Sequence, residues 1–207
     1  MDYVKNSIIS TVVEKDILQF RTVKSPALFK QAFEIMISYP AQEISFTKLL
    51  GQLQERGNVE IIKHYINLYE GVFLLKALEK YSNKPVLCKS SSPKILPLAP
   101  CWPYLQIRSS YHPEEEGRVF EALVGAQLHR TGEELFYWRE GKIEVDFVLK
   151  QGRNIWAIEV KSGRKRSGDG LKKFKEHFPS ASLAMITKDN YFSFEENPIK
   201  FLTDHHV

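Results

Sequence analysis

The chain of 207 residues is long enough for one large domain or two small ones. Its composition, 43% hydrophobic and 26% charged, excludes a disordered protein, and no apolar run of about 18 residues predicts a membrane-spanning helix. The net charge of +4 is too mild to identify a partner. Two cysteines, Cys88 and Cys101, make no disulfide framework and lack metal-ligand spacing, so we expect a reducing cytoplasm and no structural zinc.

Four helices are predicted in the first part of the chain, where apolar residues recur at helical spacing over residues 4–20, 25–40, 45–57 and 58–75. Ser25 suits an N-cap because a proline follows it at the first helical position, and Pro40 ends that helix. Ser45 is the next expected N-cap. The last helix would bury a stripe that consists of Ile61, Tyr65, Leu68 and Val72.

Two β-prone segments, residues 74–82 and 84–89, follow these helices. Short helices, a turn and a two-stranded wing are the pattern of a winged helix-turn-helix. Residues 83–103 contain five prolines, which exclude a helix and predict short edge strands followed by a linker. We therefore expect a first, helical domain with its proline-rich linker over residues 1–103.

The second domain, residues 104–207, alternates helices and strands. Residues 114–132 predict a helix that ends at Gly132, and residues 170–179 predict a second helix. The predicted strands are residues 134–140, 142–150, 155–163 and 181–188. The order α-β-β-β-α-β predicts an α/β fold with a mixed central sheet.

Three charged residues interrupt the two central strands of this domain: Asp146 on one, and Glu159 and Lys161 on the next. Strand alternation directs Glu159 and Lys161 to one face, and it directs Asp146 away from Val145 and Phe147. If the strands pair through the intervening turn, the three charges converge. Nearby carboxylates repel each other, and Mg²⁺ or Mn²⁺ would remove that repulsion. A lysine beside them can position the water that attacks a phosphodiester.

This arrangement resembles the signature of the PD-(D/E)xK nucleases, the restriction-endonuclease-like superfamily. The resemblance implies that Asp146, Glu159 and Lys161 are catalytic. It also implies a metal-binding role for Glu121, which matches the helical glutamate that often completes the metal site. Glu121, Asp146 and Glu159 would then hold Mg²⁺ or Mn²⁺.

Longer segments resemble a narrower group. Residues 117–128, 134–149 and 156–163 together are similar to the C-terminal domain of unknown function (DUF 4143) that follows the ATPase in prokaryotic AAA-type ATPases. Residues 12–20 and 37–78 resemble the winged-helix segment of the same proteins. The chain has no Walker A loop of the G-x-x-x-x-G-K-[ST] type, so we expect no nucleotide site. The ATPase module would have been deleted, encoded separately or lost.

A basic run lies between Lys161 and Lys175 and contains Arg164, Lys165, Arg166 and Lys172. One interpretation is a phosphate-binding edge for DNA, to which Lys63 and His64 on the fourth predicted helix would add contacts. The other interpretation is an ordinary solvated surface. We expect no membrane partner, and the sequence does not predict an oligomeric state.

Two functions remain open from the sequence. The first is a DNA-binding or regulatory module of an AAA-type ATPase system, with a nuclease-like fold that does not cleave. The alternative is a Mg²⁺-dependent DNA endonuclease, in which Lys161 aligns the attacking water and the three carboxylates hold the metal.

Overall fold

The computed structural model describes residues 23, 25–53, 58–82, 91–99, 101–104, 113–163 and 168–204. The helix predicted over residues 4–20 and the strand predicted over residues 84–89 lie outside the described residues. Described residues up to 104 are called the first half below, and residues 113–204 the second half. Within this part of the chain, no helix is long and apolar enough to span a membrane.

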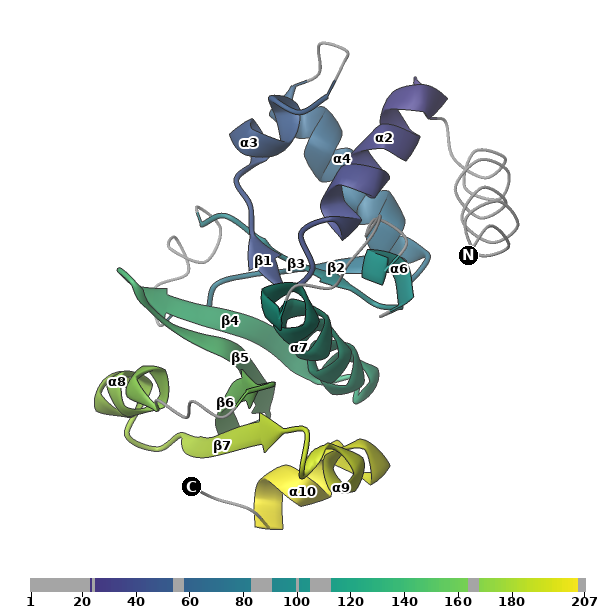
Figure 1. Cartoon of the computed structure of the whole chain (residues 1–207). Helices are drawn as coiled ribbons and strands as arrows, with labels where there is room; N and C mark the ends of the chain where they lie inside the picture. The colour runs from purple at the N-terminus through teal and green to yellow at the C-terminus, as the bar shows by residue number, and fades with distance from the viewer. Residues whose placement is uncertain are drawn as a thin grey trace.

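The first half places three helices over a three-stranded sheet (Figure 1). Side-chain caps begin these three helices: Ser25, Ser45 and Asn58 accept hydrogen bonds from backbone N–H groups in the first turns. The elements, in chain order, are α2 (Pro26–Ile37), β1 (Gln42–Glu43), α3 (Phe46–Leu50), α4 (Val59–Gly71), β2 (Leu75–Leu78), β3 (Lys94–Pro97) and the short α6 (Cys101–Tyr104).

Aromatic side chains dominate the core of the first half. Phe29 and Phe33 of α2 pack against Tyr69 of α4, with ring centroids 4.5 and 5.3 Å from the tyrosine ring. The Tyr69 hydroxyl donates a hydrogen bond to the Phe29 carbonyl, so the buried phenol keeps a polar partner. This contact fixes α2 against α4.

Two sequence predictions for the first half were wrong in detail. The buried stripe of α4 consists of Ile62, Tyr65, Ile66 and Tyr69, so the helix is rotated relative to the predicted stripe, and Val72 is exposed. The helix also ends at Gly71, because the chain turns there into β2. The proline-rich segment was predicted to form edge strands. Its strand β3 is instead fully buried and is the central strand of its sheet, between β1 and β2.

The second half confirms the predicted order α-β-β-β-α-β around a mixed sheet. Its strands have the order β4-β5-β6-β7, in which β4, β5 and β6 are antiparallel and β7 is parallel to β6. Two helices that the sequence analysis did not predict follow the last strand. The elements are α7 (Pro113–Arg130), β4 (Glu134–Glu140), β5 (Ile143–Gln151), β6 (Asn154–Lys161), α8 (Asp169–His177), β7 (Ser182–Thr187), α9 (Tyr191–Glu196) and α10 (Pro198–Asp204).

Helices cover both faces of this sheet (Figure 1). On one face, α7, α9 and α10 pack against strand residues such as Phe147 and Ile158. On the other face, α8 buries Leu171 and Phe174 against Val148. Strand residues are therefore apolar on both faces, and a charged strand residue must find its partner at an end of the sheet.

The two halves share their packing rather than touching only at a surface. Leu78 and Leu96 of the first sheet belong to the same hydrophobic core as α7 and β5. Tyr81 and Glu79 also exchange backbone hydrogen bonds of 2.7 and 3.1 Å with Tyr137, which extends pairing along the outer edge of β4. This segment covers an edge that would otherwise expose unpaired backbone groups.

Candidate functional site

A β-bulge in β5 sets the direction of Asp146. The pairing of β4 with β5 shifts register between Phe136 and Trp138, so that Asp146 and Phe147 both lie opposite Tyr137. Because of the bulge, the β5 residues that precede it point to the opposite face of the sheet from the one that regular alternation predicts. The expectation that Val145 shares a face with Phe147 was therefore wrong: Val145 packs in the core under α8.

The side chain of Asp146 takes over a hydrogen bond of the sheet. Its Oδ2 accepts the backbone N–H of Val160 at 2.7 Å, while regular pairing between β5 and β6 ends at Phe147 and Ile158. The carboxylate thus stands where a backbone carbonyl of β5 would otherwise continue the ladder. This bond connects the two strands that carry the predicted charged residues.

Glu159 is 4% exposed and has two partners. Its Oε2 lies 3.1 Å from Nζ of Lys161 on the same strand. Its carboxylate also accepts a hydrogen bond from the backbone N–H of Leu171, in the first turn of α8, whose N-cap residue Gly168 supplies no side-chain cap. Glu159 therefore caps α8 from a neighbouring strand.

The start of α8 lies very close to β5 and β6. A Cβ atom added at Gly170 would lie 2.0 Å from the Glu144 carbonyl oxygen and 2.6 Å from Oε1 of Glu159. A residue without a side chain is required here for the helix to approach Glu159.

Lys94, a residue that the sequence analysis did not single out, completes the cluster. It comes from β3 in the first half, is 4% exposed, and its Nζ lies 2.5 Å from Oε1 of Glu121 on α7. The same ammonium donates to the backbone carbonyl of Asp146 at 3.1 Å and lies 5.1 Å from the centroid of the Phe147 ring. The term carboxylate cluster below means Glu121, Asp146 and Glu159 with Lys94 and Lys161.

The predicted residues Glu121, Asp146, Glu159 and Lys161 are thus brought into one electrostatic neighbourhood. The charges of Asp146, Glu159 and Glu121 all raise the pKa of Lys161, although burial lowers it. Burial raises the pKa of Glu159, and the charge of Asp146 makes a smaller contribution in the same direction. The sequence therefore identified residues that do converge, but it did not find the buried lysine among them.

Burial dominates the proton affinities in the cluster. It raises the pKa of Glu121 to about 8; the charge of Asp146 raises this pKa further, and the charge and hydrogen bond of Lys94 lower it. Burial also raises the pKa of Asp146, against the attraction of Lys94. The pKa of Lys94 is raised despite its burial, because Glu121 and Asp146 stabilise the ammonium. At neutral pH the site therefore holds the ammonium groups of Lys94 and Lys161, and the three carboxyl groups lie around them.

The arrangement does not fit a divalent cation. Metal ligation requires carboxylate oxygens that converge on one point with little competition. Here Glu121 faces Lys94, Asp146 accepts the Val160 N–H, and Glu159 engages Lys161 and the α8 backbone. Among the described residues, no group of three or more His, Cys, Asp or Glu side chains could hold a metal ion. An internal ammonium, that of Lys94, lies where the carboxylates need a positive charge.

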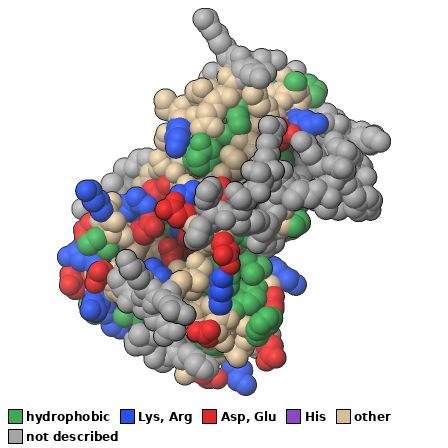
Figure 2. Space-filling view, viewed as in Figure 1, with side chains coloured by type: hydrophobic (Ala, Val, Ile, Leu, Met, Phe, Trp, Pro, Cys, Tyr) green, Lys and Arg blue, Asp and Glu red, His purple; other side chains and the backbone are tan. Residues whose placement is uncertain are grey.

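The predicted nucleic-acid contacts are dispersed. Lys63 pairs with Glu60 at 3.0 Å, and His64 is exposed on the same helix. Lys172 is exposed on α8. The predicted contacts Arg164, Lys165 and Arg166 lie outside the described residues. Figure 2 shows acidic and basic side chains interspersed on the visible face of the second half rather than a single basic surface.

A signal for Lys94 was present in the sequence. The lysine directly precedes Ile95 and Leu96, and a lysine within a buried apolar strand requires a carboxylate partner. What the sequence lacks is the partner's identity, because α7 and β5 approach β3 only through tertiary packing.

Comparisons with known proteins give families without an assigned function. No curated protein and no solved structure matches the chain. Residues 116–203 match the family described as domain of unknown function (DUF4143), and residues 1–97 match the family described as domain of unknown function (DUF8612). The carboxylate cluster draws on both segments, since Lys94 lies in the first match and the other four residues lie in the second.

Proposed function

We propose that this chain is a regulatory binding module, in which a winged helix is joined to an endonuclease-like fold that does not cleave nucleic acid. The order α2-β1-α3-α4-β2-β3, with β3 between β1 and β2, supports the winged helix. The order α7-β4-β5-β6-α8-β7, with Asp146 on β5 and Glu159-x-Lys161 on β6, supports the endonuclease-like fold.

The ion pair between Lys94 and Glu121 is the observation that carries the proposal. A metal-dependent nuclease needs its carboxylates available to the cation and needs open positions for water and phosphate. In this chain a buried lysine from the first half lies 2.5 Å from the helical glutamate and donates a hydrogen bond to the Asp146 backbone carbonyl. The site thereby works as a structural connection between the halves.

The test is nicking of supercoiled plasmid DNA by the wild-type chain, Asp146→Asn and Lys161→Ala. Each protein is incubated with Mg²⁺, with Mn²⁺, with Ca²⁺ and with chelator, and its thermal midpoint is measured in parallel. We expect no nicking in any condition and a lower midpoint for Asp146→Asn. Nicking that needs Mg²⁺ or Mn²⁺ and disappears in both variants would overturn the proposal.

A Mg²⁺-dependent DNA endonuclease is the second candidate. The position of Lys161, beside Glu159 and within the field of Asp146, favours it. This activity would require Lys94 to leave Glu121, because the two side chains lie 2.5 Å apart. Metal-dependent nicking by Lys94→Met, absent from the matched variant Lys94→Met/Asp146→Asn, would support this candidate.

The partners that we propose follow the resemblance to AAA-type ATPases. A separate ATPase module would be regulated by this chain, and duplex DNA would contact the basic run between Lys161 and Lys175. The regulatory role is tested by measuring ATP hydrolysis by such a module with and without the chain. An unchanged rate at saturating chain concentration would contradict it.

A further inference from the structure

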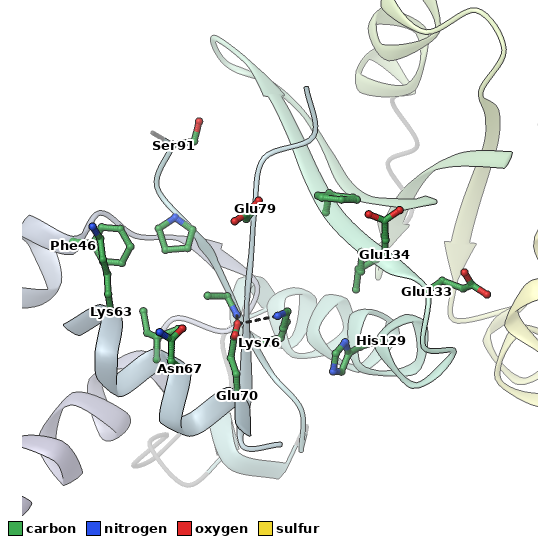
Figure 3. A pocket seen from close by; sticks show the side chains of 15 residues that line it. Phe46, Lys63, Asn67, Glu70, Lys76, Glu79, Ser91, His129, Glu133 and Glu134 are labelled. Carbon is green, nitrogen blue, oxygen red and sulfur yellow. Dashed lines mark hydrogen bonds and ion pairs between the residues drawn. The ribbon is translucent and has the colours of Figure 1, made fainter. Parts of the chain in front are cut away.

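A groove separate from the carboxylate cluster lies between the two halves. Its volume is about 520 Å³, within the range of about 300–1,000 Å³ that is typical of ligand pockets. Figure 3 shows α4 and β2 side chains of the first half on one side and His129, Glu133 and Glu134 of the second half on the other. None of the five residues of the carboxylate cluster lines this groove.

The charges that line the groove are predominantly negative. Four glutamates face two lysines, Lys63 and Lys76, and both lysines already have acidic partners. Lys76 lies 3.2 Å from Glu70, and Lys63 lies 3.0 Å from Glu60 outside the lining. Burial and the charge of Lys76 lower the pKa of His129, so the imidazole adds no positive charge at neutral pH. The groove therefore carries an excess of negative charge.

Two glutamates account for that excess. Glu79, directly after β2, and Glu133, directly before β4, form no ion pair in the described part of the chain, and Glu133 accepts a hydrogen bond from the Gln151 amide at 2.8 Å. The remaining two, Glu70 and Glu134, are paired with Lys76 and Lys150. Glu79 and Glu133 thus line the groove from different halves of the chain.

Apolar side chains supply most of the remaining lining, among them Phe46, Ile66, Leu135 and Phe136. An arginine or lysine side chain suits such a surface, because its aliphatic stem packs on aromatic rings while its charged end reaches a carboxylate. Phosphates of a nucleic acid would instead meet the unpaired carboxylates of Glu79 and Glu133. The chemistry therefore favours a basic, partly apolar polypeptide over DNA.

We propose that this groove docks a short basic segment of a protein partner, through Glu79, Glu133 and the aromatic side chains that line it. The proposal does not depend on whether the carboxylate cluster is catalytic. It gives the exposed side of α4, which the sequence analysis associated with DNA, a protein ligand instead.

The test uses a fluorescently labelled hexapeptide of alternating arginine and leucine, with fluorescence anisotropy at an ionic strength of about 0.1 M. The control peptide replaces arginine by glutamate, and a labelled duplex DNA is titrated in a separate experiment. The decisive variant is Glu79→Lys/Glu133→Lys. The matched control variant is Glu176→Lys/Asp204→Lys, which changes net charge equally at exposed positions outside the groove.

We expect the groove variant to weaken peptide binding at least tenfold, whereas the control variant weakens it less than threefold. The milder Glu79→Gln/Glu133→Gln variant should weaken binding by an intermediate factor, and it remains informative if the charge reversal impairs folding. Equal losses in the two charge-reversed proteins would show that only net charge matters, and this would overturn the proposal. Affinity for a labelled duplex DNA that changes in the groove variant but not in the control variant would also overturn it, because it would assign the same surface to nucleic acid.

Discussion

Replacing Lys94 by methionine removes the buried ammonium while keeping a side chain of similar length. The change leaves Glu121 without its 2.5 Å partner and removes the donor to the Asp146 carbonyl. Removing one partner of a buried ion pair costs about 3–5 kcal/mol when the remaining partner stays charged. Here Glu121 can take up a proton, so the cost depends on pH.

The sign of that dependence follows from the raised pKa of Glu121. Its folded pKa of about 8 lies above the unfolded value, so the contribution of this group to stability is full below about pH 4.5 and is lost as pH rises through 8. Without Lys94, which lowers that pKa, the folded value rises further. The loss in Lys94→Met should therefore be about 1 kcal/mol at pH 6, mainly the lost hydrogen bond, and about 3 kcal/mol at pH 9.

Urea unfolding at pH 6 and pH 9 measures these differences directly, on wild type, Lys94→Met, Glu121→Gln and the double variant. At pH 9 the thermal midpoint of Lys94→Met should fall by about 6–12 °C, since 1 kcal/mol corresponds to about 2–4 °C in a chain of this size. The double variant should be more stable than Lys94→Met at pH 9, because no buried charge is left unpaired. A loss of unfolding free energy in Lys94→Met that is equal at both pH values would refute this account of the site. So would effects of Lys94→Met and Glu121→Gln that simply add in the double variant.

Three further outcomes are expected. Gly170→Ala should lower the free energy of unfolding in urea by about 2–3 kcal/mol, because the added Cβ would overlap the Glu144 carbonyl. Gly71→Ala is the control, since its Cβ would meet nothing within 4 Å and should cost nothing. Similar effects of the two substitutions would contradict the close packing of α8. Asp146→Asn keeps an oxygen for the Val160 N–H but loses the attraction to Lys94 and Lys161, so we expect a loss of about 1–3 kcal/mol, and an unchanged or higher thermal midpoint would disprove it. Replacing Arg164, Lys165 and Arg166 by alanine should weaken duplex binding and flatten the slope of log K against log salt by about 2–3, and unchanged anisotropy titrations would assign this run to ordinary surface.

The strands of the second half were predictable because their patterns are local. Apolar alternation and the glycine turns at Gly141 and Gly152, both with positive φ, fix the hairpins of β4, β5 and β6. The direction of Val145 was not predictable, because the bulge depends on how β4 pairs with β5. The role of Lys94 was not predictable either, because its partners belong to elements that follow β3 in the chain and reach it only through tertiary packing.

In the first half, the sequence predicted the helix caps correctly, but it did not predict which face of α4 is buried. Ser25 and Ser45 act within one turn of their own position, so sequence alone identifies them. The face of α4 that is buried depends on where Phe29 and Phe33 of α2 approach it, which no pattern within α4 records. β3 was misjudged because its flanking prolines suggest an edge, although only Pro97 lies within the strand, at its end.

The pairing of Glu79 and Tyr81 with Tyr137 has a consequence for how this chain can be divided. A fragment limited to residues 116–203 would keep every strand of its sheet but would leave the edge of β4 bare, beside an apolar surface stripped of Leu78 and Leu96. Bare strand edges next to apolar surface template association between copies. Such a fragment should therefore self-associate during expression, and the addition of residues 75–97 should restore a monodisperse product in light scattering.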